Sequence, residues 1–210
     1  MKLGRGGFGA VYGCTLPAAA SSTGQAVKKF TRELTDQRYQ DFLAEVSIIN
    51  RLRHKNVVPL VGWSYNKGEP LLIYEYMNNG SLDQHLFQSG GFGRTRQQQD
   101  TAIGQWDTRY SIARDIATGL QYLHHEHEPM VLHRDIKASN IMLDSAFCAR
   151  LGDFGIASTV DAERNSVTGV AGTIGYVINY KATRQTDIYA FGVVILEIVT
   201  GQQEEHARPS

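Results

Sequence analysis

Cysteine and proline are scarce in this chain, which has two Cys and five Pro among 210 residues. Cys14 and Cys148 lie far apart, so the sequence predicts neither a disulfide framework nor a cysteine zinc site, and a reducing compartment is the simplest interpretation. An excess of one charge is also absent, since Lys plus Arg number 21 and Asp plus Glu number 21. This balance removes the main electrostatic argument for binding nucleic acid or an anionic membrane.

Long hydrophobic runs are missing as well. The start, MKLGRGGFGA, has no apolar core and is not typical of a signal peptide. The longest apolar stretch, 188–200, is too short to span a membrane and contains Glu197. The remaining composition, 42% hydrophobic and 20% charged, is ordinary for a globular protein, and the length allows one large domain or two small lobes.

The first part of the chain has the pattern of a small antiparallel sheet with one helix. Glycine turns and β-branched residues predict three strands at its start, and 57–64 and 70–76 predict two more. Between them, apolar residues at helical spacing predict a helix over 36–53, with Asp36 as a candidate cap.

From residue 77 onward the pattern is mainly helical. Residues 88–105 are rich in Gly and Gln and are predicted to form an irregular loop. A long helix is predicted to follow Asp107, which can serve as its cap, and short strands and loops are predicted over 131–154. Residues 188–199 are nearly all apolar and predict a buried helix.

The first motif with chemical meaning is GRGGFGAV at 4–11. Gly4, Gly6 and Gly9 would let backbone N–H groups approach phosphates. Alone, the run also fits a dinucleotide-binding turn or an ordinary turn. A dinucleotide site has a strand before its glycines and a helix after them. Here a strand containing Val11 follows, which favours a flap that closes over a nucleotide.

A lysine and a carboxylate form the second candidate pair. Lys28 ends an apolar strand, where a lysine is usually solvated, but it could also hold phosphate oxygens if a carboxylate fixed it. Glu45, on the predicted helix, can supply that carboxylate. Lys29 is predicted to face the opposite side of the strand and to be solvated.

Two further motifs, HRDIKASN at 133–140 and DFG at 153–155, complete a charged set. Each by itself could be a charged loop or a turn. Together with the lysine they contain the residue types that hold a magnesium triphosphate and orient a hydroxyl group. In chain order these residues are Lys28, Asp135, Asn140 and Asp153.

With these motifs the chain resembles a eukaryotic protein kinase domain of the plant receptor-like kinase group. The lectin-domain receptor kinases are the most similar, on the stretches RLRHKNVVPLVGW, LLIYEYMNNGSLDQHLF, VLHRDIKASNIMLD, LGDFGIA and DIYAFGVVILEIVTG. The resemblance covers almost the whole chain. It implies an α+β fold of two lobes, a sheet lobe with one helix over 1–76 and a mainly helical, incomplete lobe over 77–210. It also implies a parent receptor in the plasma membrane with this domain on the cytoplasmic side.

The resemblance implies ATP and Mg²⁺ as cofactors and gives single residues their roles. The implied cofactor-binding residues are Gly4, Gly6, Gly9, Val11, Lys28, Glu75 and Met77. The implied catalytic residues are Lys28, Glu45, Asp135 and Lys137, and the implied metal ligands are Asn140 and Asp153. Glu75 and Met77 would act through their backbones on the adenine edge, and Tyr74 would limit the pocket behind it. Lys137 is typical of kinases that phosphorylate serine and threonine in proteins.

Regulation and support are also implied by the resemblance. Ser166 and Thr168 are candidate autophosphorylation sites, with Ser158 and Thr159 as further candidates, and a phosphate there could pair with Arg134. Residues 172–176 match the substrate-docking segment. Asp187 matches a residue that braces the catalytic loop, and a helix N-cap is its alternative interpretation.

The chain also departs from the family pattern. The Pro-Glu pair expected after Tyr176 is absent, and both ends are short, so we expect the helix over 188–199 to expose an apolar patch. The intact charged set favours a protein serine/threonine kinase domain of a receptor. The missing supports favour an alternative, a catalytically weak nucleotide-binding module that acts as a partner or decoy. Nucleic acid is not an expected partner.

Overall fold

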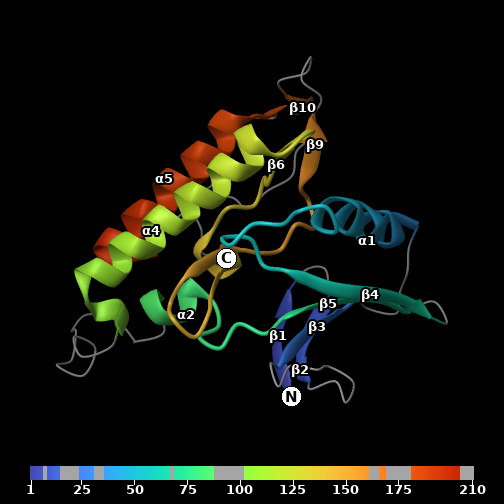
Figure 1. The fold of residues 1–210 in the computed structure, drawn as a ribbon, viewed down its shortest axis with the longest axis horizontal. Coiled ribbons are helices and arrows are strands. Elements are labelled where there is room, and N and C mark those ends of the chain that lie inside the picture. The colour runs from blue at the N-terminus through green and yellow to red at the C-terminus, as the bar shows by residue number, and fades with distance from the viewer. Residues whose placement is uncertain are drawn as a thin grey trace.

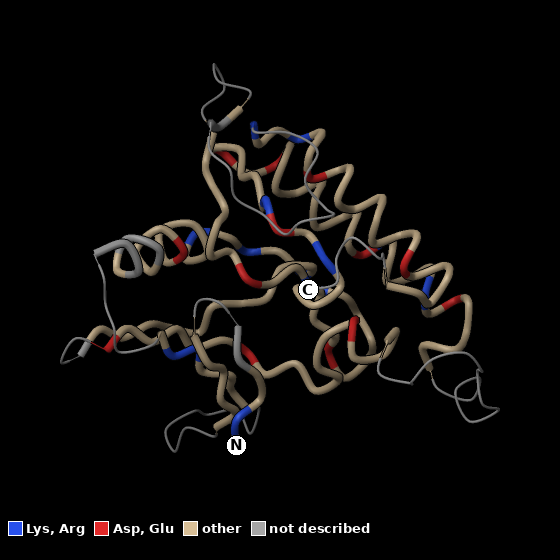
Figure 2. Tube along the Cα trace, turned by 180° about the vertical axis from the view of Figure 1, so that it is seen from behind, with Lys and Arg blue, Asp and Glu red and all other residues tan. Residues whose placement is uncertain are grey.

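The computed structural model describes residues 1–6, 9–14, 24–30, 36–66, 69–87, 102–160, 166–168 and 181–203. These residues form a part built on a β-sheet and a mainly helical part that lie against each other (Figure 1). Lys, Arg, Asp and Glu are interspersed along the trace rather than gathered on one side (Figure 2), in keeping with the balanced charge. None of the helices described is long and apolar enough to cross a membrane.

The sheet part contains one five-stranded antiparallel sheet. Its strands are β1 (Lys2–Gly6), β2 (Gly9–Cys14), β3 (Gln25–Lys29), β4 (Leu60–Asn66) and β5 (Glu69–Glu75), in the order β1-β2-β3-β5-β4. The five predicted strands are therefore confirmed. The one predicted over 57–64 begins later, however, because Val57 instead forms an isolated bridge with Leu151.

Helix α1 (Asp36–Ile49) packs on the sheet through a buried aromatic residue. The ring of Phe42 lies 5.5 Å from that of Phe30 and 6.4 Å from that of Trp63. Since residues three apart share a helix face, this packing also turns Glu45 toward the interior. Asp36, the candidate cap, is the first residue of the helix, and its side chain lies outside the described part.

The helical part is dominated by α4 (Trp106–Gln121) and α5 (Arg184–Thr200), which lie side by side (Figure 1). The smaller helical elements are α2 (Leu82–Phe87), η1 (Ala102–Gly104), η2 (Tyr122–Glu126) and η3 (Ala138–Asn140). The short strands are β6 (Met130–Leu132), β7 (Ile141–Leu143), β8 (Ala149–Leu151), β9 (Ser158–Val160), β10 (Val167–Thr168) and β11 (Lys181–Ala182). They pair as β6–β9, β7–β8 and β10–β11.

Two expectations for the start of α4 need correction. The residue at the N-cap position is Gln105, which makes no side-chain cap, so Asp107 is not the cap. The carboxylate of Asp107 lies in the first turn, where a negative charge suits the helix dipole. In the loop predicted over 88–105, residues 102–104 form a 3₁₀ turn, and residues 88–101 lie outside the described residues.

Helix α5 carries its own signals at both ends. Thr183 and Thr186 form a reciprocal capping box at its start. Gly201, with φ of 67°, ends it in the left-handed conformation that glycine adopts without strain. These signals explain why an almost wholly apolar segment has well-defined limits.

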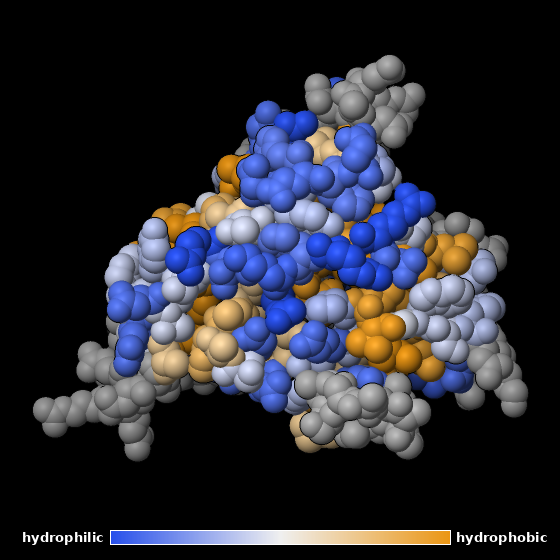
Figure 3. Space-filling model, viewed as in Figure 1, coloured by the Kyte–Doolittle hydropathy of each residue, from blue (hydrophilic) through white to orange (hydrophobic). Residues whose placement is uncertain are grey.

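The predicted burial of this helix holds for one side only. Ala190, Val193, Val194 and Ile198 are buried, whereas Ile188, Tyr189, Leu196 and Val199 are between 44% and 58% exposed. The expected apolar patch is therefore present, and hydrophobic residues also reach the surface over this region in Figure 3. The opposite side joins a single core cluster that extends to α1 and the sheet.

Candidate active site

A cavity of about 640 Å³ lies between the two parts, and almost every predicted site residue lines it. The predicted residues in its lining are Gly4, Gly9, Val11, Lys28, Glu45, Glu75, Met77, Asp135, Lys137, Asn140 and Asp153. Gly6 pairs with Gly9 in the β1–β2 ladder. Residues from three distant regions of the sequence thus face one space.

The neighbouring strand β3 explains why residue 9 is a glycine. Its φ of +151° is rarely adopted by other residues, and a Cβ here would lie 2.2 Å from the carbonyl oxygen of Lys29. At Gly4, by contrast, an added Cβ would meet nothing within 4 Å. Gly9 therefore keeps β2 close to β3, whereas no neighbouring atom requires a glycine at Gly4. Of the glycine run, residues 7 and 8 lie outside the described residues.

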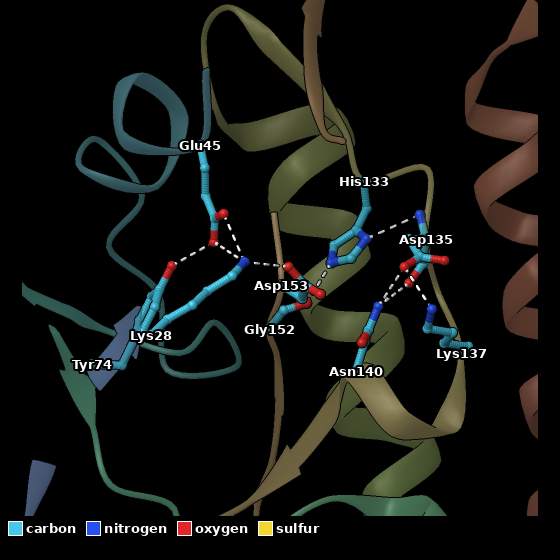
Figure 4. Close-up of polar contacts among 9 residues, drawn as sticks. All are labelled: Lys28, Glu45, Tyr74, His133, Asp135, Lys137, Asn140, Gly152 and Asp153. Carbon is cyan, nitrogen blue, oxygen red and sulfur yellow. Dashed lines mark hydrogen bonds and ion pairs between the residues drawn. The ribbon is translucent and has the colours of Figure 1, made fainter. Parts of the chain in front are cut away.

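Lys28 joins two carboxylates on the sheet side of the cavity (Figure 4). Its Nζ lies 3.0 and 2.8 Å from the two oxygens of Glu45 and 2.8 Å from Oδ1 of Asp153. Burial alone would lower the pKa of Lys28, but the two carboxylates raise it above its ordinary value. The ammonium group is therefore held charged.

The two carboxylates respond to this burial differently. Burial raises the pKa of Glu45 above its ordinary value despite the opposing charge of Lys28. Burial would also raise the pKa of Asp153, but Lys28 outweighs it and holds that pKa below the ordinary value. Asp153 therefore stays ionised at the cavity. Its backbone has a φ of 57°, in the left-handed region, where the chain turns.

Tyr74 is a second partner of Glu45, which sequence reasoning missed. Its hydroxyl donates to Oε1 of Glu45 at 2.7 Å, and burial followed by the charge of Glu45 raises its pKa well above the ordinary value. The prediction gave Tyr74 only a steric role behind the adenine. A hydrogen bond across 29 sequence positions leaves no pattern in the sequence that could have revealed it.

The opposite side of the cavity is built from the 133–140 loop (Figure 4). Lys137 Nζ lies 2.8 Å from Oδ2 of Asp135. The side-chain amide of Asn140 donates to the same oxygen at 2.8 Å and to the carbonyl of Asp135 at 2.9 Å. Because these two bonds use the NH₂ group of Asn140, its amide oxygen is the atom that could bind a metal ion.

Asp187 anchors this loop from behind. Its carboxylate accepts from the backbone N–H of His133 and of Arg134, each at 2.8 Å, and lies 2.8 Å from Nε2 of His124. Because Thr183 caps α5, the N-cap interpretation of Asp187 is wrong and the brace is confirmed. His124, buried between these elements, was not singled out by the sequence.

His133 links the loop to the segment before Asp153. The backbone N–H of Asp135 donates to its Nδ1 at 3.3 Å, so the ring hydrogen lies on Nε2, which donates to the carbonyl of Gly152 at 3.0 Å. The two motifs that hold the predicted catalytic and metal-binding residues are therefore tied together.

The candidate phosphorylation sites differ in their surroundings. Arg134 donates to the hydroxyl of Ser158 at 2.8 Å. Thr168 pairs with Lys181 in the β10–β11 ladder, and Ser166 immediately precedes β10. The predicted docking segment, 172–176, lies outside the described residues. Phosphorylation at any of these hydroxyls stays a prediction.

The oxygen atoms that the cavity offers suit a hard cation that takes further ligands from outside the protein. Among the residues the structure describes, no group of three or more His, Cys, Asp or Glu side chains could hold a metal ion. Asn140 and Asp153 offer oxygen atoms, and Mg²⁺ is commonly bound by one or two protein oxygens together with phosphates and water. The residues present therefore fit a magnesium nucleotide better than a metal held by protein alone.

The fold and this arrangement of charges define a protein kinase domain. The family model described as protein tyrosine and serine/threonine kinase matches residues 1–209, and the chain belongs to this family. The expected two-lobed kinase fold is thereby confirmed, while the division of the lobes at residues 76 and 77 stays a prediction.

The chain is also similar to plant receptor kinases, as the sequence resemblance indicated. It is 49% identical over 208 residues to L-type lectin-domain containing receptor kinase IX.2 of Arabidopsis thaliana, covering 96% of this chain and 29% of that protein. It is 46% identical over 213 residues to receptor kinase IX.1 of the same group and organism, covering 99% of this chain and 31% of that protein. The chain therefore spans less than a third of these relatives.

Proposed function

We propose that the chain is a protein serine/threonine kinase domain that transfers the γ-phosphoryl group of Mg-ATP to serine and threonine hydroxyls. The observation that carries this proposal is the convergence of Lys28, Glu45 and Asp153 opposite Asp135 and the other predicted residues of its loop, around one cavity. Phosphoryl transfer requires mainly positioning and neutralisation of charge, which is what such a set of groups supplies.

On the nucleotide side, each group has a stated task. Lys28, kept charged and oriented by Glu45, would bind the α- and β-phosphates. Asn140 and Asp153 would hold Mg²⁺, which when bound neutralises charge on the phosphate oxygens. The backbones of Glu75 and Met77 would meet the adenine edge, since both residues line the cavity at and just after the end of β5.

On the substrate side, Asp135 would orient the acceptor hydroxyl and take its proton. As the oxygen–phosphorus bond to the substrate forms, the bond from the γ-phosphorus to the leaving ADP oxygen breaks. Lys137, 2.8 Å from Asp135, would neutralise the phosphoryl group in transit. This lysine supports serine and threonine rather than tyrosine as the acceptors.

The names of the relatives extend the proposal to the parent protein. They are receptor kinases with an L-type lectin domain, so we infer that this domain works on the cytoplasmic side of the plasma membrane in receptor-type signalling. Its partners would be proteins with serine or threonine acceptors, including the chain itself at Ser166 and Thr168.

A second candidate is a catalytically weak nucleotide-binding module that acts as a partner or decoy. The exposed apolar face of α5 favours it, because such a face suits contact with another protein.

One preparation can separate the two candidates. We expect Mg²⁺-dependent ATP binding and transfer of labelled phosphate to serine and threonine peptides, with Asp153→Ala slowing transfer about 10² to 10³-fold. Binding without transfer would favour the module. Equal rates for the parent and Asp153→Ala would remove Asp153 from the mechanism, and labelling confined to tyrosine peptides would contradict the acceptor class.

A further inference from the structure

The β7–β8 hairpin reaches both the cavity and residues 75–80, the connecting segment between the two parts of the molecule. Met142 lines the cavity, and Arg150 is its direct partner across the antiparallel pair. Directly opposite residues of such a pair project from the same face. Their neighbours Ile141 and Leu151 are buried in the core instead. Met142, which we call the cavity floor, and Arg150 are therefore neighbours on one face of the hairpin.

Arg150 lies between two carboxylates from different parts of the chain. One terminal nitrogen donates to Oδ2 of Asp144 at 3.2 Å, and the other lies 3.9 Å from Oε2 of Glu75. The guanidinium group is planar and presents its N–H groups in a rigid fork. Its contact with Asp144 therefore fixes the direction in which it approaches Glu75.

Asp144 is itself held firmly. Its Oδ1 accepts from the backbone N–H of Ala146 at 2.9 Å and of Cys148 at 3.0 Å, which closes the turn between β7 and β8. Its carbonyl accepts from the side chain of Asn79 at 2.7 Å. Arg150 thus projects from a rigid base rather than from a loose surface.

Glu75 is the last residue of β5 and opens the connecting segment. The far end of that segment is fastened by backbone bonds, from Asn79 N–H to the carbonyl of Leu143 at 3.1 Å and from Leu143 N–H to the carbonyl of Gly80 at 2.8 Å. At the near end, the ion pair with Arg150 links Glu75 to the same hairpin. The hairpin therefore contacts both ends of this segment, through backbone hydrogen bonds at one end and through the side chain of Glu75 at the other, where the backbone N–H of Glu75 donates to the carbonyl of Pro59 at 3.2 Å.

We propose that Arg150 is a positioning residue for the nucleotide base, which holds the connecting segment at Glu75 in register with the cavity floor at Met142. The inference rests on the proposed function, since it takes an adenine as the group between these two walls. The carboxylates that Arg150 contacts are those of Asp144 and Glu75, so we expect it to act on the base and not on the phosphates or the acceptor.

The test compares a ligand that has a base with one that has none. For Arg150→Gln we expect the KM for ATP to rise about two- to fivefold, the range of a partly exposed ion pair. The kcat at saturating ATP should fall by less than twofold, and the inhibition constant of magnesium tripolyphosphate should not change. Arg150→Lys should lie between Gln and the parent, because a lysine keeps the charge but not the fork.

A double-mutant cycle assigns the effect to the pair. Glu75→Gln should raise the KM for ATP to a similar degree, and the double variant should be no worse than either single variant. Arg114→Gln, an exposed arginine of α4, is the matched control and should leave both constants unchanged.

The outcomes separate this inference from the proposed function. If the parent chain fails to bind ATP, both the proposed function and the positioning role of Arg150 are overturned. If the parent binds ATP and Arg150→Gln leaves its KM unchanged, or weakens ATP and tripolyphosphate equally, or adds fully to Glu75→Gln, the positioning role is overturned and the proposed function stands.

Discussion

Two charged clusters face each other across the cavity, and they are stabilised in opposite ways. The cluster around Lys28 and Glu45 is buried and depends on its own ion pairs. The cluster around Asp135 lies on a loop whose backbone is anchored from behind by Asp187. If the proposed function holds, the first cluster supplies both stability and chemistry through the same atoms, whereas in the second cluster these two tasks fall to different residues.

Removing the lysine should break the first cluster completely. In Lys28→Met we expect phosphoryl transfer to fall about 10² to 10³-fold, because a preorganised charge on the phosphates is lost. The free energy of unfolding should also fall by about 3–5 kcal/mol, since Glu45 remains buried without its partner. Transfer assays and urea unfolding of the same preparation measure both effects.

The neighbouring residue provides a matched control. Lys29 forms its ion pair with Glu69 at the surface, at 2.8 Å. Lys29→Met should therefore cost less than about 1 kcal/mol and leave transfer unchanged. Equal losses in the two variants would contradict the distinction between a buried and a solvated lysine.

In the second cluster, a substitution should lower activity while the free energy of unfolding is nearly kept. Asp135→Asn keeps an oxygen for the amide of Asn140 but removes the proton acceptor, so we expect transfer to fall about 10²-fold. The free energy of unfolding should change much less than in Lys28→Met, because the loop backbone keeps its anchor at Asp187 and Lys137 can still reach solvent. Asp107→Asn, in the exposed first turn of α4, is the control for the lost charge. Unfolding of Asp135→Asn under native conditions would refute the division of tasks.

The smallest expected change in activity among the cluster variants concerns the hydroxyl of Tyr74. Tyr74→Phe keeps the ring but leaves Glu45 with Lys28 alone, so we expect the free energy of unfolding to fall by about 1.5–3 kcal/mol. The kcat/KM for ATP should fall a few-fold, much less than in Lys28→Met. Tyr110→Phe, with an exposed ring, should change neither quantity. Wild-type stability in Tyr74→Phe would show that Glu45 does not need its second partner.

Sequence reasoning succeeded where chemistry is carried by local motifs. Asp135, Asn140 and Asp153 were found because their neighbours in sequence are also their neighbours in space. Lys28 and Glu45 were found because strand and helix periodicities turn both inward. The cavity brings these residues together as expected.

The errors and omissions have a common physical cause. An acidic residue in the first turn of a helix looks the same in sequence whether it caps the helix, as expected of Asp107, or braces another segment, as Asp187 does. Tyr74 with Glu45 and Arg150 with Glu75 meet only through tertiary packing. Periodicity likewise could not tell which side of α5 would remain exposed.

The end signals of α5 have a consequence for folding. A segment that carries a capping box and a left-handed glycine has its limits fixed by local interactions, and the buried side of α5 adds the tertiary packing from which a helix gains most of its stability. Its central amide protons should then exchange with solvent among the slowest in the chain, even beneath the side chains that water reaches. We therefore expect the base on which Asp187 stands to persist when neighbouring segments open locally.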